Sequence, residues 1–234
     1  MNGSEPRALS LVERYALPPA EIERRSLALV DAALADRFAD AGERAVAGRV
    51  VYAAGDLGLA ERLRFQGRAV RAAVDALRAG CSIVVDVRMV AAALDRARLE
   101  RLGSELVCAI DLPGVEALAR ELGVTRAIAG VRLAESRLDG AVIAIGNAPT
   151  ALLALLDLID AGTVRPACVI GMPVGFVAAA EAKAELARRG VPAIAVAGTR
   201  GGSPLAAAAV NALLRLALDA ASPAATASRS GGAP

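Results

Sequence analysis

Runs of consecutive apolar residues recur along the chain from residue 82 onward. Five of them are rich in Val and Ile and lack polar alternation, as is typical of parallel strands covered on both faces: 82–87, 105–110, 141–145, 167–170 and 193–197. Stretches with helical spacing lie between and after them: 114–122, 125–138, 151–161, 178–189 and 205–218. This alternation predicts an α/β fold, a doubly wound, five-stranded parallel sheet flanked by helices.

The first 80 residues have a helical pattern. A helix is expected over 20–38, because Pro18 and Pro19 precede it and Glu21 lies in its first turn. Two more are expected over 43–54 and 68–79, each followed by a glycine that can terminate a helix.

The composition does not change abruptly before the last residues of the chain. We therefore expect a single domain over 9–218. Residues 219–234 consist mainly of Ala, Ser, Gly and Pro without large apolar side chains, which predicts a disordered tail.

The composition excludes several kinds of site. The 234 residues contain no histidine, so no Ser-His-Asp triad, Cys-His dyad or His-ligated zinc can form. Any acid–base chemistry must use Tyr, Asp, Glu, Cys, Arg or the single lysine, Lys183. The three cysteines form no CxxC motif, so neither a metal site nor a disulfide framework is expected. A net charge of +2 and 2% aromatic residues argue against a nucleic-acid partner.

The start of the chain and its apolar runs indicate the cellular compartment of the protein. The sequence MNGSEPRALS lacks the apolar segment of a secretory signal. No apolar run reaches the ~18 residues of a membrane span without interruption by charge, Gly or Pro. We therefore expect a cytoplasmic protein without a membrane partner.

Three glycine-rich loops follow the last three predicted strands, over 146–150, 171–176 and 198–203. Ligands of open parallel sheets bind beyond the carboxyl ends of the strands, where exposed backbone N–H groups and helix N-termini attract anions. One such loop is an ordinary turn, whereas three in succession indicate a large ligand with several carboxylates or phosphates. The motifs GxxxxGK[ST] and, after the first predicted strand, GxGxxG are absent, so neither ATP nor NAD is expected.

Several segments together carry a family resemblance. They are IERRS at 22–26, RVVYAAGD at 49–56, DVRMV at 86–90, GNAPTALL from residue 146, GMPVGFV from residue 171 and GGS at 201–203. Over about residues 10–218 the chain resembles the precorrin-8X (cobalt-precorrin-8) methylmutase family. The resemblance implies a homodimeric α/β enzyme of cobalamin biosynthesis, an isomerase that needs no cofactor. It would shift a methyl group of the precorrin-8X macrocycle from C11 to C12, giving hydrogenobyrinate or its cobalt form.

The resemblance also implies which residues bind the substrate. They are Arg25, Ser26, Arg126, Asn147, Thr150, Gly175, Arg200, Gly201, Gly202 and Ser203. Without the motif match, Arg25 and Arg126 would be interpreted as parts of solvated helix faces. A tetrapyrrole with many carboxylate arms suits arginines and glycine-lined loops. Asp86, at the end of the first predicted strand, is expected to be structural.

The expected catalytic position departs from the family pattern. Family members usually have histidine where this chain has Tyr52, and that histidine is regarded as the acid that protonates the macrocycle. A phenol has a reference pKa near 10 against about 6.5 for imidazole, so full proton transfer is disfavoured by roughly 5 kcal/mol. Three interpretations of Tyr52 are open: a working donor, a relic in a homologue that binds a corrinoid without turnover, as a carrier or partner subunit, and a packing residue at a helix end.

Overall fold

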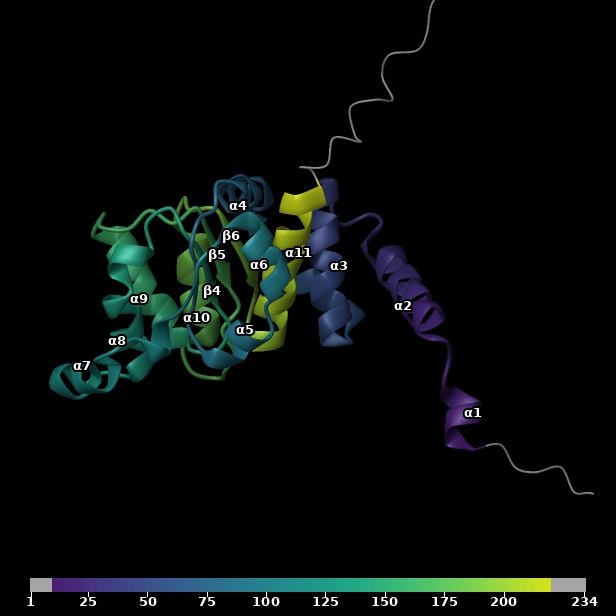
Figure 1. Ribbon diagram of the computed structural model, residues 1–234, viewed down its shortest axis with the longest axis horizontal. Helices are drawn as coiled ribbons and strands as arrows, with labels where there is room; N and C mark the ends of the chain where they lie inside the picture. The colour runs from purple at the N-terminus through teal and green to yellow at the C-terminus, as the bar shows by residue number, and fades with distance from the viewer. Residues whose placement is uncertain (1–9, 220–234) are drawn as a thin grey trace, which may run out of the picture.

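Helices cover both faces of a six-stranded sheet in the computed structural model, which describes residues 10–219 (Figure 1). The strand order is β1-β6-β5-β4-β2-β3. The strands are β1 (Leu63–Gln66), β2 (Ile83–Val85), β3 (Leu106–Cys108), β4 (Val142–Ile145), β5 (Cys168–Gly171) and β6 (Ala193–Val196). Strands β2 to β6 pair in parallel, and they are the five strands predicted from the apolar runs.

The predicted count of five strands was wrong by one. Strand β1 pairs antiparallel with β6 at the edge of the sheet, within the region expected to be helical. Its four residues alternate between apolar Leu63 and Phe65 and polar Arg64 and Gln66, so they lack the continuous apolar run of a central strand. An edge strand has one free side and tolerates such polar residues.

Each central strand contributes to two cores because successive side chains point to opposite faces. In β4, Val142 and Ala144 join one core, and Ile143 and Ile145 join the other. The first core is covered by α3 (Ala41–Ala54), α4 (Ala69–Arg78), α5 (Arg88–Ala92), α6 (Arg96–Leu102) and α11 (Ser203–Asp219). The second is covered by α8 (Arg126–Leu133), α9 (Pro149–Asp160) and α10 (Ala179–Ala187), and α7 (Val115–Leu122) packs on α8.

Most predicted helices are confirmed with small shifts of their ends. The helix expected over 20–38 is α2 (Pro19–Leu34), which ends four residues early. The stretch 125–138 divides into α8 and the 3₁₀ helix η3 (Glu135–Arg137). The pattern did not predict α1 (Leu11–Tyr15), α5, α6 or the 3₁₀ helices η1 (Leu57–Arg62) and η2 (Ala109–Asp111), which are all short.

The predicted tail begins one residue too early. Asp219 is the last residue of α11, because the helix runs beyond the predicted end at 218. Residues 220–234, the rest of the predicted tail, lie outside the described residues, as does residue 9. The assignment of 9–218 to a single domain stays a prediction.

The N-terminal helices extend away from the sheet. In Figure 1, α1 and α2 (purple) lie beyond α3, with α1 farthest from the body of the molecule. Helix α2 packs on α3 through Val30 and Leu34, whereas α1 buries none of its residues. No helix within residues 10–219 has the length and apolar character required to cross a membrane.

The order of the strands creates a crevice at one edge of the sheet. The chain runs from β2 outward to β3, then crosses back over β2 to β4 and continues to β5 and β6. The direction of winding therefore reverses between β2 and β4. Open α/β sheets bind ligands at the carboxyl ends of the strands beside such a reversal.

Candidate active site

A cleft of about 250 Å³ lies at this reversal. Its lining comes from the segments that follow β2, β3 and β4, together with the start of α8: Val87, Arg88, Met89, Ile110, Arg126 and Asn147. Two of the predicted site residues, Arg126 and Asn147, thus line one cleft although they are distant in the sequence. Two guanidinium groups, those of Arg88 and Arg126, thus lie in the wall of the cleft.

A buried carboxylate shapes the loop after β4. Asp86 is 2% exposed, and its oxygens accept hydrogen bonds of 2.9 Å from the backbone N–H groups of Gly146, Asn147 and Ala148. These donors stabilise the charged form, but burial outweighs them and raises the pKa of Asp86 above its usual value. Asp86 thereby ties the loop after β4 to the end of β2, next to the cleft.

Backbone hydrogen bonds join the three glycine-rich loops to one another. The Val174 N–H donates to the Asn147 carbonyl at 3.4 Å, and the Gly175 N–H donates to the Thr199 carbonyl at 3.1 Å. The Gly202 N–H donates to the Met172 carbonyl at 2.8 Å. The loops therefore form one continuous surface along the carboxyl edge of the sheet.

Gly201 allows the second and third loops to touch. A Cβ atom at this position would lie 2.4 Å from the Met172 carbonyl oxygen and 2.5 Å from that of Pro173. Real Cβ atoms do not approach backbone oxygens so closely. Only glycine permits this contact between the loops.

The single lysine also joins these two loops. The Lys183 ammonium, carried by α10, donates to the Pro173 carbonyl at 3.0 Å and to the Arg200 carbonyl at 2.6 Å. The side chain is buried, and desolvation lowers the pKa of Lys183 to about 8.

Arg200 connects the third loop to the segment that contains Tyr52. Its guanidinium forms an ion pair with Asp56, which lies just after α3 and also accepts a hydrogen bond of 2.9 Å from the Gly58 N–H. This contact brings the end of α3 to the carboxyl edge of the sheet. Arg200 was predicted to bind substrate, and in this structure its guanidinium is paired with a carboxylate of the protein.

The Tyr52 side chain lies on the surface at the end of α3. It is 41% exposed, whereas the preceding Val50 and Val51 are buried, so the interpretation as a packing residue is not supported. The Arg49 guanidinium lies over its ring, 5.9 Å from the centroid. Within residues 10–219 the Tyr52 hydroxyl has no hydrogen-bond partner, which leaves it free to donate to a ligand.

The start of α9 meets the start of α8. The hydroxyls of Thr150 and Thr125 are hydrogen-bonded at 3.1 Å, and Thr125 caps the helix whose first residue is Arg126. Arg126 forms an exposed ion pair of 3.2 Å with Glu116, which is weak enough to exchange for another carboxylate. The structure thus brings Thr150, Asn147 and Arg126 into one region.

Ser203 begins the 17-residue helix α11 and is only 4% exposed. Within residues 10–219 its hydroxyl makes no hydrogen bond. A Cβ atom on Gly146 would lie 2.9 Å from the Ser203 Cα, so the loop after β4 packs directly against this helix start. The positive end of a long helix and an unpaired hydroxyl favour an anion here.

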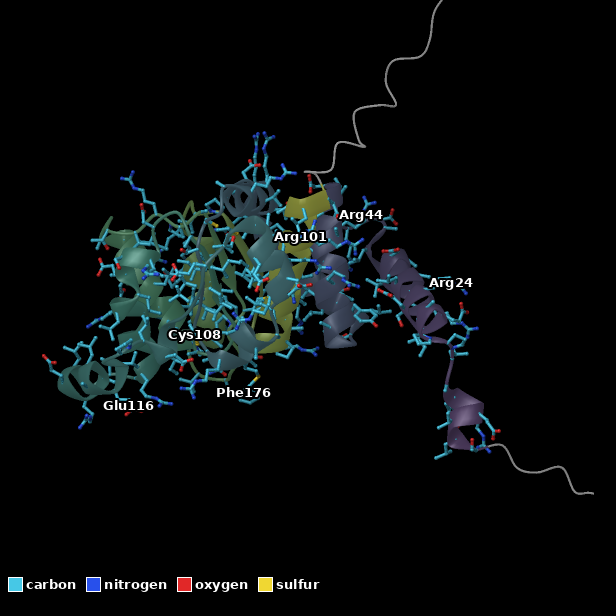
Figure 2. The ribbon with its side chains drawn as sticks, in the orientation of Figure 1. Arg24, Arg44, Arg101, Cys108, Glu116 and Phe176 are labelled. Atoms are coloured by element: carbon cyan, nitrogen blue, oxygen red, sulfur yellow. The ribbon has the colours of Figure 1, made fainter. Side chains whose placement is uncertain are left out.

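The structure does not bring Arg25 and Ser26 to these residues. Arg25 pairs with Glu21 at 2.5 Å, and Ser26 donates to the Ile22 carbonyl at 2.7 Å, all within α2. Helix α2 lies beyond α3 and α11, at the opposite end of the molecule from α8 (Figure 1). Figure 2 shows the same separation between the labelled Arg24 on α2 and Glu116 near the cleft.

Several residues of this edge were not among the predicted site residues. Arg88 and Met89 line the cleft, and Arg88 pairs with Asp111 at 2.5 Å. Their position directly after the first parallel strand is the signal that could have identified them. Phe176 is 95% exposed and projects from the lower edge of the molecule in Figure 2. An exposed aromatic ring in a glycine-rich loop was a further signal.

The described part of the chain shows no grouping of His, Cys, Asp or Glu side chains that could hold a metal ion. The cysteines among residues 10–219 are free, and burial raises the pKa of the Cys108 thiol to about 11. The edge also presents backbone amides, hydroxyls and the guanidinium groups of Arg88 and Arg126, whose exposed ion pairs with Asp111 and Glu116 can exchange for carboxylates of a ligand.

Comparison with known proteins agrees with this chemistry. The family model for precorrin-8X methylmutase matches residues 21–216. The precorrin-8X methylmutase of Pseudomonas aeruginosa is 46% identical over 196 residues, covering 82% of this chain and 93% of that protein. The cobalt-precorrin-8 methylmutase of Priestia megaterium is 40% identical, covering 85% and 88%. The crystal structure of precorrin-8X methylmutase from Thermus thermophilus superposes with a TM-score of 0.76 at 42% identity, covering 85% and 98%. The chain therefore belongs to the precorrin-8X methylmutase family.

Proposed function

We propose that the protein is a precorrin-8X methylmutase, an isomerase of cobalamin biosynthesis. It moves a methyl group of the macrocycle from C11 to C12 and gives hydrogenobyrinate, or the cobalt form of this product. The observation that carries the proposal is the continuous surface of three glycine-rich loops beside the reversal of the sheet, in a chain of this family.

The loops and arginines bind the carboxylate arms of the substrate. Arg88 and Arg126 line the cleft, and their ion pairs with Asp111 and Glu116 are exposed enough to exchange for substrate carboxylates. The start of α11, at Ser203, offers a further anion site. Met89 lines the cleft, and Phe176 projects from the loop after β5, so both present exposed apolar surface that suits the face of a large ring.

Tyr52 acts as the donor to the macrocycle. Its hydroxyl is exposed and unpaired among residues 10–219, and the Asp56–Arg200 ion pair holds the end of α3 at the binding edge. A hydrogen bond that strengthens as charge develops on the ring lowers the barrier without requiring a stable phenolate. The methyl group migrates within one molecule, so the reaction consumes no co-reactant.

We also propose that the enzyme is a homodimer in which α2 of each chain completes the site of the other. A cleft of about 250 Å³ is smaller than the ~300–1,000 Å³ typical of sites for drug-sized ligands, and a tetrapyrrole is larger still. The projecting helices α1 and α2, with the segment between them, expose the apolar side chains of Leu11, Val12, Tyr15, Leu17, Ile22 and Leu29. A second copy that covers them would bring its own Arg25 and Ser26 to the edge that this chain leaves incomplete.

A mixing experiment tests the shared site. Tyr52→Phe and Arg25→Glu chains are each expected to be inactive alone. In a mixed dimer, one site combines an intact Tyr52 with an intact Arg25 from the other chain, so activity returns. If both residues act within one chain, every site of the mixed dimer carries a defect and no activity returns.

Turnover tests the function itself. The full chain, incubated with precorrin-8X, is expected to form the orange chromophore of hydrogenobyrinate, with the methyl group at C12 by NMR. Binding of hydrogenobyrinate without conversion of precorrin-8X would instead indicate a corrinoid-binding protein. Failure to bind either compound would overturn the proposal.

A further inference from the structure

The use of basic residues in this chain is very uneven. Of 27 basic side chains, 26 are arginines, and Lys183 is the single lysine. Every other basic position of the chain is an arginine. Position 183 is therefore the one place to examine for a requirement that only an ammonium group meets.

The geometry at Lys183 supplies such a requirement. The ammonium bridges two backbone carbonyls, at 3.0 Å to Pro173 and 2.6 Å to Arg200, and the side chain is 3% exposed. The two loops are already in contact at Gly201, where an added Cβ would clash with two carbonyl oxygens. A compact ammonium fits between such close backbones, whereas a planar guanidinium with five donors is larger and needs a wider space.

Holding this charge in the interior costs free energy. Within residues 10–219 no carboxylate forms an ion pair with Lys183, so only carbonyl dipoles compensate the buried charge. Desolvation accordingly lowers the pKa of the ammonium to about 8. An apolar side chain would avoid this cost if α10 needed only to be packed against the sheet.

We propose that Lys183 is a positioning residue of the active site: by bridging the Pro173 and Arg200 carbonyls, it sets the spacing between the loops after β5 and β6. That spacing places Gly201, Gly202 and Ser203 to receive a carboxylate of the substrate. Lys183 does not touch the substrate. The inference rests on the proposed function and adds a residue to its machinery.

Two variants and a control test this role. Lys183→Met and Lys183→Arg are expected to raise KM for precorrin-8X by about tenfold, while kcat changes little, because uniform binding is lost. Gln66→Met is the control, since Gln66 donates to the Leu186, Arg189 and Val191 carbonyls at and beyond the C-terminal end of α10, and to neither of the carbonyls that Lys183 bridges. It is expected to lower Tm without changing KM. A folded Lys183→Met protein with the KM of the wild type would overturn the proposal.

A measurement on the unmodified protein covers the case in which the variants do not fold. Because the chain has one lysine, ¹³C-lysine labelling gives a single side-chain Cε signal in the NMR spectrum. Saturation with hydrogenobyrinate is expected to shift this signal, and no shift would overturn the proposal. A wild-type protein that binds no hydrogenobyrinate would contradict the proposed function as well, whereas bound product with an unmoved signal contradicts only the role of Lys183.

Discussion

Two buried charges of opposite sign organise the binding edge at the scale of single residues. Asp86 receives three backbone N–H groups of the loop after β4, and Lys183 donates to one carbonyl in each of the other two loops. Both side chains bond to backbone atoms rather than to side chains. Each therefore fixes the course of a loop, and the proposed function assigns ligand binding to groups on these loops.

Replacing Asp86 by Asn should destabilise the protein. The asparagine amide cannot accept all three hydrogen bonds, because its NH₂ group is itself a donor and would face backbone N–H donors. We expect a loss of about 1–3 kcal/mol in the free energy of unfolding, measured with denaturant, and weaker binding of hydrogenobyrinate. Asp139→Asn serves as a control, since Asp139 accepts one exposed backbone hydrogen bond from the Arg165 N–H. Equal, small effects of both substitutions would contradict this account of Asp86.

The pKa of Lys183 makes stability depend on pH in a defined direction. The pKa in the folded protein, about 8, lies below the ordinary value of 10.5, so the unfolded chain binds more protons between these two values. The free energy of unfolding contributed by this group therefore rises as the pH increases from about 8 to 10.5. The difference in the free energy of unfolding between the wild type and Lys183→Met, measured as a function of pH, isolates this contribution. A difference that stays constant over this interval would show that the ammonium is not desolvated.

At the scale of elements, the binding edge is built from loops whose backbones touch. The loop after β4 packs on the start of α11, and the loop after β5 packs on Gly201. Close contact between backbones leaves little room for side chains and keeps N–H groups available to a ligand. The three loops should therefore respond as one unit to a substitution in any of them.

Gly201→Ala tests this coupling. Its Cβ would have to displace the Met172 and Pro173 carbonyls, which are backbone atoms and cannot move independently. We expect a loss of about 1–3 kcal/mol in stability and a lower affinity for hydrogenobyrinate. Gly190→Ala is the matched control, because no atom lies within 4 Å of a Cβ at that position. A Gly201→Ala protein that binds the product like the wild type would refute the coupling.

At the scale of the whole molecule, a single chain leaves its N-terminal helices uncovered. Helices α1 and α2 project beyond the body, expose apolar side chains, and carry two of the predicted site residues away from the cleft (Figure 1). A two-fold symmetric dimer in which each chain covers the projecting helices of the other accounts for these observations together.

Substitution of the projecting helices should dissociate this dimer. Val12 and Leu29 are 71% and 63% exposed in the single chain, so Val12→Asp and Leu29→Asp should leave its fold intact. Each substitution removes about 2 kcal/mol of stabilisation by apolar burial. The loss is doubled because two-fold symmetry places the substituted residue in the interface twice. Light scattering should report a dimer for the wild type and for the control Asp31→Asn, and a monomer without turnover for the aspartate variants. A wild-type monomer with full turnover would rule out the shared site.

The sequence predicted the parts of the fold that have local signals. Five strands followed from apolar runs, and the three loops followed from glycines that end them. Strand β1 was not predicted because an edge strand needs no apolar run. The position of Arg25 was not predicted because it depends on how separate helices pack. Lys183 bridges two carbonyls that are 10 and 17 residues away from it in the sequence, so no local sequence pattern predicts these contacts. Its only trace in the sequence is the isolated lysine.

One set of turnover measurements tests the role of Tyr52 as the donor most directly. The rate of hydrogenobyrinate formation from precorrin-8X would be measured for wild type, Tyr52→Phe and Tyr52→His at equal concentration. We predict turnover by the wild type and by Tyr52→His, and a loss of about 10²–10⁴-fold in kcat for Tyr52→Phe, which removes only the donor. An inactive wild type beside an active Tyr52→His protein would contradict the account, because the natural chain would then bind a corrinoid without converting it.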